Sequence, residues 1–367
     1  MLLAKIGSAV RLVLLNLSVF VLIVALIEGL ASVLLVSKWI MHLTPLAEKM
    51  HTRYDPELGW VNIPNTLIKD IYGQGIDVRI NSQGLREDAE IGSAVRAKQL
   101  RLVCLGDSFT FGFGSGHDQT WCHQLSLLAP KVQTVNMGLG GYGFDQYYLW
   151  YKRDGGSLKH DITLVAVVTD DFNRMHRDDF LGYPKPRLEV REGELKVRNV
   201  PVPRSPYVLP WMTLQYRMPL HELAVVRLYR SLVSDPDGGD LRVDRQEFEV
   251  VLAKLVEDLK RVAQERGSRL VLVYLPQGTD HEPNALTDWY LSDLRMVAAQ
   301  QGVWFIDLVF DFRLMRRAQI LEMFIAPGSV PFVGADGHYS VKGNKLVADL
   351  LYRKLMAIPE LSTLLSD

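Results

Sequence analysis

From residue 101 onward, the sequence alternates short apolar runs with segments of helical length. The runs RLVCLG, VQTVNMG, ITLVAVV and RLVLVYLP begin at residues 101, 132, 162 and 269. Arg245–Arg266, which precedes the last run, has the spacing of an amphipathic helix, with apolar side chains at Phe248, Val251, Leu252, Leu255 and Leu259. Uninterrupted apolar strands separated by helices are typical of a parallel sheet that is covered on both faces. We therefore predict an α/β domain.

A second feature is the apolar run LVLLNLSVFVLIVALIEGLASVLLVS at residues 12–37, in which Glu28 is the one charged residue. At ~1.5 Å per residue, a helix over this run is about 39 Å long, which is enough to cross a hydrocarbon core of about 30 Å. The run is longer than the apolar region of a cleaved signal peptide. It lies between Arg11 and Lys38, where membrane-flanking cations are expected. We predict an uncleaved transmembrane anchor.

The orientation of this anchor and the role of Glu28 stay open at the level of sequence. Positive charges on the two sides are nearly balanced, but the leading tail is short, which favours a cytoplasmic amino terminus and a domain outside the cytoplasm. Glu28 is interpreted as a functional intramembrane acid, a helix–helix contact or a snorkelling side chain.

The predicted organisation has four parts and one insertion. They are a tail at 1–11, the anchor at 12–37, a juxtamembrane lead-in at 38–98 and a catalytic domain at 99–367. The lead-in contains the turn signals Thr44-Pro45 and Asp55-Pro56 and short β-like runs. We expect an insertion at about 178–240, containing a hairpin at 187–199 that turns at Glu192-Gly193 and a proline-rich connection after it.

Three segments follow predicted strands or the last predicted loop, where ligands bind in open α/β folds. In the first, Gly106-Asp107-Ser108, the serine is placed to expose a nucleophilic hydroxyl and to offer its own N–H to an oxyanion. The alternative is an ordinary strand-to-helix turn in which Asp107 or Ser108 caps the helix.

The second segment, Asn136–Gly143, is rich in glycine, so its backbone N–H groups can approach a substrate oxygen. Gly138, Gly140 and Gly143 also form the G-x-G-x-x-G pattern of dinucleotide-binding proteins. That pattern requires an acidic residue at the end of the next strand, whereas Asp161 precedes ITLVAVV. A dinucleotide enzyme using Gly138–Gly143 is retained as an alternative.

The third segment is Asp336-Gly337-His338. A histidine in this last loop can take the Ser108 proton, and Asp336 can then fix the tautomer of the imidazole and stabilise its cation. The alternative is a surface or capping histidine in a polar loop.

Together the three segments resemble the sequence blocks of the SGNH (GDSL-type) hydrolase superfamily. GDSFTFG is similar to its first block, NMGLGGYG to its second and DGHYSVKGN to its last, and the resemblance runs from about Arg101 to the carboxyl terminus. It implies a flavodoxin-like three-layer α/β/α domain and serine-dependent ester hydrolysis or acyl transfer without a cofactor. Ser108 would be the nucleophile, His338 the general base and Asp336 the orienting acid. The N–H groups of Ser108 and Gly141 would be oxyanion donors.

Two departures from the family pattern affect the expected site. The family's third block supplies an Asn side chain as a further oxyanion donor, and here ITLVAVV is followed by Thr169-Asp170-Asp171-Phe172-Asn173. Asp170 serves in that place only if burial keeps it protonated; otherwise Thr169 or Asn173 supplies the donor, or two backbone groups suffice. In addition, Asp336 lies two residues before His338, where the family has three, so a Ser–His dyad is the alternative to a triad.

Two functions from different classes follow. The first is a membrane-anchored serine esterase, or an O-acyltransferase, acting on an acylated small molecule or on acylated surface glycans, at a bacterial inner membrane with the domain periplasmic or extracellular. The second is a catalytically weak, glycan-binding assembly component.

Five aromatic residues after the second block are interpreted as a sugar-stacking wall or as helix core: Tyr142, Phe144, Tyr147, Tyr148 and Trp150.

Charge and metal-ligand patterns limit the partners. The 41 Lys+Arg and 42 Asp+Glu give a formal net charge of −1, which argues against a general nucleic-acid binder. The nine histidines show no metal-ligand spacing, and His117 and His123 are interpreted as structural, so we expect no metal and no cofactor. Cys104 and Cys122 are predicted to be free thiols, with pairing in an oxidising compartment as the alternative. Protein partners are not indicated.

Overall fold

The computed structural model describes residues 2–41, 51–95, 99–181, 183–202, 223–233 and 245–366. The chain divides into two compact units. The first consists of residues 1–43, 181–184 and 203–243, and the second of residues 44–180, 185–202 and 244–367. Thr44-Pro45, the proline-rich connection from residue 203 and much of the predicted insertion lie outside the described residues.

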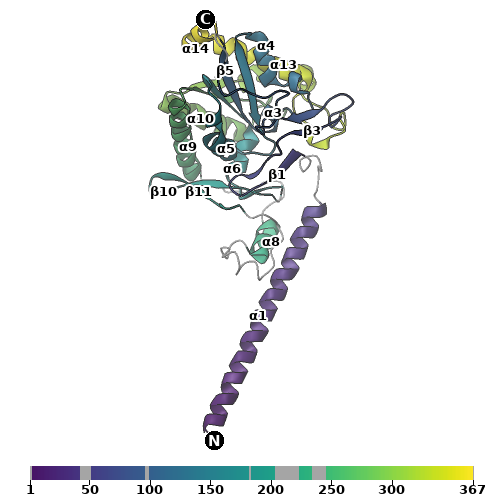
Figure 1. The fold of residues 1–367 in the computed structure, drawn as a ribbon, viewed down its shortest axis with the longest axis vertical. Coiled ribbons are helices and arrows are strands. Elements are labelled where there is room, and N and C mark those ends of the chain that lie inside the picture. The colour runs from purple at the N-terminus through teal and green to yellow at the C-terminus, as the bar shows by residue number, and fades with distance from the viewer. Residues whose placement is uncertain are drawn as a thin grey trace. The chain divides into compact units, whose positions relative to one another are not determined.

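A five-stranded parallel sheet forms the centre of the second unit (Figure 1). In chain order its strands are β5 (Leu100–Gly106), β6 (Val132–Gly138), β7 (Ile162–Val167), β12 (Arg269–Tyr274) and β13 (Trp304–Asp307). Their order across the sheet, β6-β5-β7-β12-β13, is the 2-1-3-4-5 order of flavodoxin-like folds. The predicted α/β fold with a flavodoxin-like parallel sheet is confirmed.

Helices cover both faces of this sheet, which explains why its strands are apolar without interruption. On one face, alternate strand residues such as Leu102, Cys104 and Leu164 pack under α4 (Trp121–Leu128) and α13 (Val341–Met356). The other face carries α5 (Phe144–Asp154), α9 (Arg245–Glu265) and α10 (Ala285–Gln301), which pack on one another. The predicted helix Arg245–Arg266 is therefore α9, and its apolar positions are buried.

Several further elements of the second unit are short or lie at its periphery. They are α3 (Ser108–Phe111), η1 (His117–Gln119), η2 (Gly155–Ser157), α6 (Thr169–Met175), β8 (Asp179–Phe180), α11 (Val309–Arg313), α12 (Arg317–Met323), η4 (Val333–Ala335) and α14 (Pro359–Ser366). The five aromatic residues interpreted as a wall or as core, from Tyr142 to Trp150, are buried, which makes them core.

Cys104 and Cys122 form a disulfide, so the prediction of free thiols is wrong. Cys104 lies on β5 and Cys122 in the first turn of α4, and their Cα atoms are 6.3 Å apart. Residues 18 positions apart in sequence meet because α4 packs directly on the sheet. This proximity depends on the tertiary fold and has no signature in the sequence.

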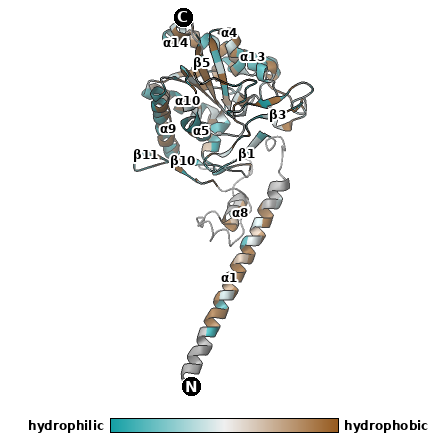
Figure 2. Cartoon of the chain, viewed as in Figure 1, coloured by the Kyte–Doolittle hydropathy of each residue, from teal (hydrophilic) through white to brown (hydrophobic). Residues whose placement is uncertain are grey.

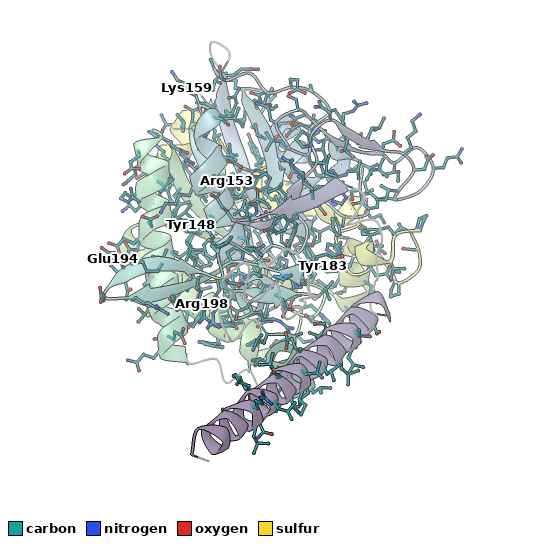
Figure 3. The ribbon with its side chains drawn as sticks, turned by 60° about the horizontal axis from the view of Figure 1, so that its bottom comes forward. Tyr148, Arg153, Lys159, Tyr183, Glu194 and Arg198 are labelled. Carbon is teal, nitrogen blue, oxygen red and sulfur yellow. A yellow bond between two sulfur atoms is a disulfide. The ribbon has the colours of Figure 1, made fainter. Side chains whose placement is uncertain are left out.

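Residues 51–95 form two small antiparallel sheets. β1 (Thr52–Asp55) pairs with β2 (Gly59–Asn62), and β3 (Thr66–Ile68) pairs with β4 (Val78–Ile80). Arg153 of α5, labelled in Figure 3, binds Asp55 of β1 at 2.9 Å. Residues 51–95 of the lead-in thus belong to the second unit.

The predicted hairpin is confirmed as β10 (Arg187–Arg191) paired with β11 (Glu194–Arg198). Glu192 and Gly193 both have positive φ, 54° and 77°, as a tight two-residue hairpin turn requires. Glu194 and Arg198, labelled in Figure 3, are the first and last residues of β11.

The first unit contains α1 (Leu2–Met41), α8 (Ala224–Val233) and β9 (Tyr183–Pro184). Figure 2 shows that the coloured part of α1 is predominantly hydrophobic. Its segment Arg11–Leu35 is long and apolar enough to span a membrane or to be a signal sequence. The expected apolar amino-terminal helix is present, and it is longer than the apolar run itself.

Candidate active site

Ser108 is the first residue of α3, directly after β5. The preceding Asp107 caps this helix, because its Oδ1 accepts from Phe109 N–H at 2.8 Å. A Cβ at Gly106 would lie 2.1 Å from Thr110 Oγ1, so this tight strand-to-helix turn requires glycine there. Ser108 is 5% exposed. Asp107 therefore caps the helix, as in the alternative interpretation, and Ser108 lies at the carboxyl end of a central strand.

His338 lies against Ser108, although the two are 230 residues apart in sequence. Its Nε2 is 2.7 Å from Ser108 Oγ. The imidazole packs near the rings of Phe109 and Phe113, with centroid distances of 4.6 and 5.3 Å. Burial is the largest influence on the pKa of His338 and lowers it below its ordinary value. A neutral imidazole at neutral pH is able to accept the serine proton.

Asp336, the predicted orienting acid, makes no side-chain hydrogen bond with His338 in the described part of the chain. Both of its oxygens accept from Gly328 N–H, at 3.2 and 3.3 Å. Asp336 and Gly337 occupy the two central positions of a type II turn, in which His338 N–H donates to Ala335 O at 3.0 Å. The two side chains have different partners: the Asp336 carboxylate bonds to Gly328 N–H, and the His338 imidazole bonds to Ser108 Oγ.

The Nδ1 atom of His338 has no side-chain partner in the described part of the chain. It lies near the carbonyl groups of Ala335 and Asp336, which raise the pKa of the imidazole, but it makes no hydrogen bond of ordinary geometry with a described residue. The structure therefore brings two of the three predicted catalytic residues together and leaves the third apart.

A different carboxylate, that of Asp107, contacts the serine. Its Oδ2 is 3.3 Å from Ser108 Oγ and 2.9 Å from Arg174 Nη1. Arg174 also donates to Asp171 at 2.8 Å and to Tyr142 O at 3.0 Å. The charge of Asp107 raises the pKa of His338, against the effect of burial, and the charge of Arg174 lowers it.

Sequence reasoning treated Asp107 only as a helix cap and did not single out Arg174. The spacing of Asp171 and Arg174, three residues apart in a short helix after a central strand, was the available signal. The side chains of Asp107 and Asp171 are 1% and 0% exposed, so their charges are balanced mainly by Arg174.

The expected backbone oxyanion donors lie in two adjacent loops. Gly141 has φ +78°, a left-handed conformation that glycine adopts without strain. The N–H groups of Ser108 and Gly141 donate no hydrogen bond to any described residue. The rings of Phe180 and Trp60 lie next to Gly141, since a Cβ there would be 2.5 and 3.4 Å from them.

The three candidates for a third oxyanion donor hydrogen-bond to residues other than Ser108 and His338. Asp170 accepts from Gln277 Nε2 at 2.8 Å and from Asn173 Nδ2 at 3.5 Å. Asn173 Oδ1 accepts from Tyr290 OH at 3.1 Å, and Thr169 Oγ1 is 3.0 Å from Tyr274 OH. Within the described residues, none of the three hydrogen-bonds to Ser108 or His338.

The three glycines of the G-x-G-x-x-G pattern pack against this chain itself. A Cβ at Gly138 would lie 2.3 Å from Phe111 N, and one at Gly140 would lie 2.4 Å from the Phe113 ring. At Gly143 it would lie 2.6 Å from Asp145 Oδ1. Close packing against α3 and the loop after it thus explains Gly138 and Gly140 without a nucleotide.

The lead-in holds the carboxyl end of α3. Arg86, which is fully buried, donates to the carbonyl groups of Phe111 and Ser115 and, at 2.6 Å, to that of Gly112. The Phe111 carbonyl has no partner inside so short a helix, and the Gly112 carbonyl also accepts from Ser115 N–H at 3.2 Å. A segment outside the resemblance therefore helps to position the Ser108 turn.

His117 and His123 lie together, with His117 Nε2 3.2 Å from His123 Nδ1 and 3.4 Å from Glu87 Oε2. In the described part of the chain, no group of three or more potential ligands is arranged to hold a metal ion.

No protein-family model and no curated protein matches this sequence. Solved structures of similar shape include three named for ester or lipid chemistry. One is a putative lipolytic protein of the G-D-S-L family from Desulfitobacterium hafniense DCB-2, with 14% identity and a TM-score of 0.37, covering 70% of this chain and 99% of that one. Another is the lipase/acylhydrolase from Enterococcus faecalis, with 11% identity and a TM-score of 0.41, covering 71% and 96%.

The third is a variant of an acetyl-xylooligosaccharide esterase from Geobacillus, with 16% identity and a TM-score of 0.39, covering 72% of this chain and 95% of that one. All three TM-scores are below 0.5.

Proposed function

We propose that this chain is a membrane-anchored serine hydrolase or O-acyltransferase of the SGNH type, with Ser108 as nucleophile and His338 as general base. The observation that carries the proposal is the 2.7 Å distance between Ser108 Oγ and His338 Nε2, at the carboxyl end of a central parallel strand. The resemblance of the three sequence blocks to this superfamily supports it.

In the proposed reaction, neutral His338 takes the Ser108 proton while Oγ attacks the acyl carbon of an ester. The N–H groups of Ser108 and Gly141 stabilise the resulting oxyanion. His338 then returns the proton to the leaving alcohol oxygen, which leaves an acyl-enzyme on Ser108. Attack by water completes hydrolysis, and attack by a second alcohol completes acyl transfer.

Asp107 replaces Asp336 in the electrostatics that we propose. The imidazolium formed on proton transfer is stabilised by the carboxylate of Asp107, which lies beside Ser108 Oγ. Among the described residues, none of the three candidate side chains supplies a third oxyanion donor, and removal of one donor typically costs about 3–4 kcal/mol of transition-state stabilisation. A dyad with two backbone donors and Asp107 is thus the proposed catalytic unit.

We further propose that α1 anchors the chain in a bacterial inner membrane, with the catalytic domain outside the cytoplasm. The span Arg11–Leu35 supports the anchor. The Cys104–Cys122 disulfide supports an oxidising compartment, because structural disulfides persist there and are rare in the cytosol. An ester-processing domain held at that surface is suited to acylated surface glycans, which remain the proposed substrate class.

A second candidate function is a catalytically weak glycan-binding component. The specific observations in its favour are that the Asp336 carboxylate accepts from Gly328 N–H and that the Asp170 carboxylate accepts from Gln277 Nε2. This function predicts a protein that binds acylated glycan but does not form an acyl-enzyme.

Labelling with a serine-reactive fluorophosphonate distinguishes the two functions. The hydrolase is expected to be labelled at Ser108 and to turn over p-nitrophenyl acetate, and both signals are expected to be lost in Ser108→Ala. Ser126→Ala is a matched control, since Ser126 donates to His123 O on α4. A folded wild-type protein that stays unlabelled would contradict the enzyme, and full turnover by Ser108→Ala would contradict the nucleophile.

A further inference from the structure

Glu28, the single charged residue of the apolar run, binds the amino terminus of α8. Its two carboxylate oxygens accept from the backbone N–H groups of Ala224 and Val225, the latter at 3.0 Å. Glu28 is 2% exposed, although nearly all described side chains of the span are exposed. Of the three interpretations of Glu28, the structure supports the helix–helix contact.

One face of α1 is adapted to this contact. The residues of the span that are buried are Glu28, Ala31 and Ser32, which lie within one turn of each other. Small side chains at Ala31 and Ser32 allow a second helix to approach closely. α8 packs on α1 within the first unit (Figure 1).

The position of Glu28 fixes how deep α8 begins. Leu35, the end of the candidate span, lies seven positions after Glu28, which corresponds to about 10 Å of helix. If α1 spans a membrane, the first turn of α8 lies about 10 Å inside the span. There, water is not available to the orphan N–H groups of a helix terminus, and the Glu28 carboxylate supplies their acceptors.

α8 presents an apolar face that the described residues of its unit leave exposed. Val225, Tyr229 and Leu232 are spaced as i, i+4 and i+7, on one side of the helix, and are 36%, 65% and 73% exposed. The α1 side chains next to Glu28 in sequence, Leu26 and Ile27, are also exposed and apolar. Val225, in the first turn of α8, lies at the depth of these side chains, because Glu28 joins the two helices there.

We propose that α8 is a membrane-embedded helix whose Val225–Tyr229–Leu232 face contacts lipid acyl chains, and that Glu28 holds its amino terminus at that depth. The inference rests on the anchor in the proposed function. Leu26 and Ile27 of the span are surrounded by lipid. We expect the same acyl chains to contact the exposed apolar face of the adjacent α8. The chain thus returns to the membrane between β11 and α9, in addition to its amino-terminal anchor.

Site-directed spin labelling of the full chain in phosphatidylcholine nanodiscs, one copy per disc, tests this. The native cysteines are paired, so an introduced cysteine is the one free thiol. We compare nitroxide accessibility to oxygen, which concentrates in lipid, and to a water-soluble nickel chelate. The labels are placed at Leu232→Cys on α8, at Leu26→Cys on the span and at Val250→Cys, an exposed apolar position on α9.

The expected result is that position 232 matches position 26, with high oxygen and low nickel accessibility, while position 250 shows the reverse. Water-like behaviour at 232 with lipid-like behaviour at 26 would overturn the inference and leave the anchor intact. Water-like behaviour at both would refute the anchor itself. A label at 232 that neither reagent reaches would mean that protein covers this face, which also overturns the inference.

The role of Glu28 is tested in the same discs. In Glu28→Ala, nickel accessibility at position 232 is expected to increase several-fold, because the α8 terminus loses its acceptors. Ser18→Ala is the matched control, since Ser18 donates to Leu14 O within α1 and is exposed. Unchanged accessibility in Glu28→Ala would show that this carboxylate does not hold α8 in place.

Discussion

Arg174 donates from Nη1 to the Asp107 carboxylate at 2.9 Å, directly beside the Ser108 hydroxyl. This ion pair is nearly excluded from solvent, with side-chain exposures of 11% for Arg174 and 1% for Asp107. The carboxylate that influences the serine and the histidine therefore comes from the residue preceding the serine. Asp336, which has the expected place in sequence, instead closes a turn with Gly328.

The first prediction contrasts these two carboxylates. Asp107→Asn is expected to lower kcat for p-nitrophenyl acetate on the order of 10²-fold, because an electrostatic group acting on the transition state is lost. Asp336→Asn is expected to change kcat by about twofold or less, because the partly exposed Asp336 carboxylate accepts from Gly328 N–H and not from His338, so its loss is expected to act through stability alone. Steady-state kinetics on both variants, with melting curves to confirm folding, checks this. A larger loss in Asp336→Asn would restore the predicted triad.

The second prediction concerns the pH dependence of kcat/KM. Activity needs neutral His338, so kcat/KM is expected to rise with pH and to level off once the imidazole is deprotonated. Because burial lowers the pKa of His338, the midpoint is expected below the ordinary value of 6.5. Asp107 raises that pKa, so Asp107→Asn is expected to move the midpoint to still lower pH. Asp336→Asn serves as the control and should leave the midpoint unchanged.

The third prediction concerns Glu87, whose pKa burial raises from 4.5 to about 8. The unfolded chain loses this proton near pH 4.5 and the folded chain near pH 8, so Glu87 reduces stability as the pH rises through this interval, by about 1.4 kcal/mol per pH unit. Glu87→Gln cannot ionise and is expected to be more stable than wild type at pH 8, with the difference decreasing toward pH 4.5.

Urea unfolding of the detergent-solubilised chain at several pH values measures this difference. Glu192→Gln, at the exposed hairpin turn, is the control and should follow the wild-type curve at every pH. Parallel curves for Glu87→Gln and wild type would show that the Glu87 carboxyl ionises normally in the folded protein.

The fourth prediction concerns the Cys104–Cys122 disulfide. Replacing both residues by alanine is expected to lower the free energy of unfolding by about 3 kcal/mol, since the bond closes a loop of this size in the unfolded chain. Reductant is expected to weaken wild type and to have no effect on the double variant. Equal response of the two proteins to reductant would contradict a disulfide in the native state.

The sheet and the hairpin were predictable because local patterns determine them. Uninterrupted apolar runs such as ITLVAVV need cover on both faces, and Glu192-Gly193 accepts the two positive φ angles of a tight turn. Ser108 and His338 were found through the blocks around them. The pairing of Cys104 with Cys122 was not predictable, since it depends on how α4 packs on β5.

By itself, the sequence determined the alternation of strands and helices, the apolar span and the serine and histidine that lie at the carboxyl end of the sheet. These follow from periodicity and short-range turn chemistry, which act over a few residues. The tertiary structure decided which carboxylate contacts the serine, that Asp170 pairs with Gln277, and that Glu28 receives the N–H groups of α8. The Asp170–Gln277 and Glu28–α8 contacts each join residues more than 100 positions apart in sequence. A hydrogen bond requires its donor and acceptor to lie about 3 Å apart, and only the tertiary fold brings such distant residues that close.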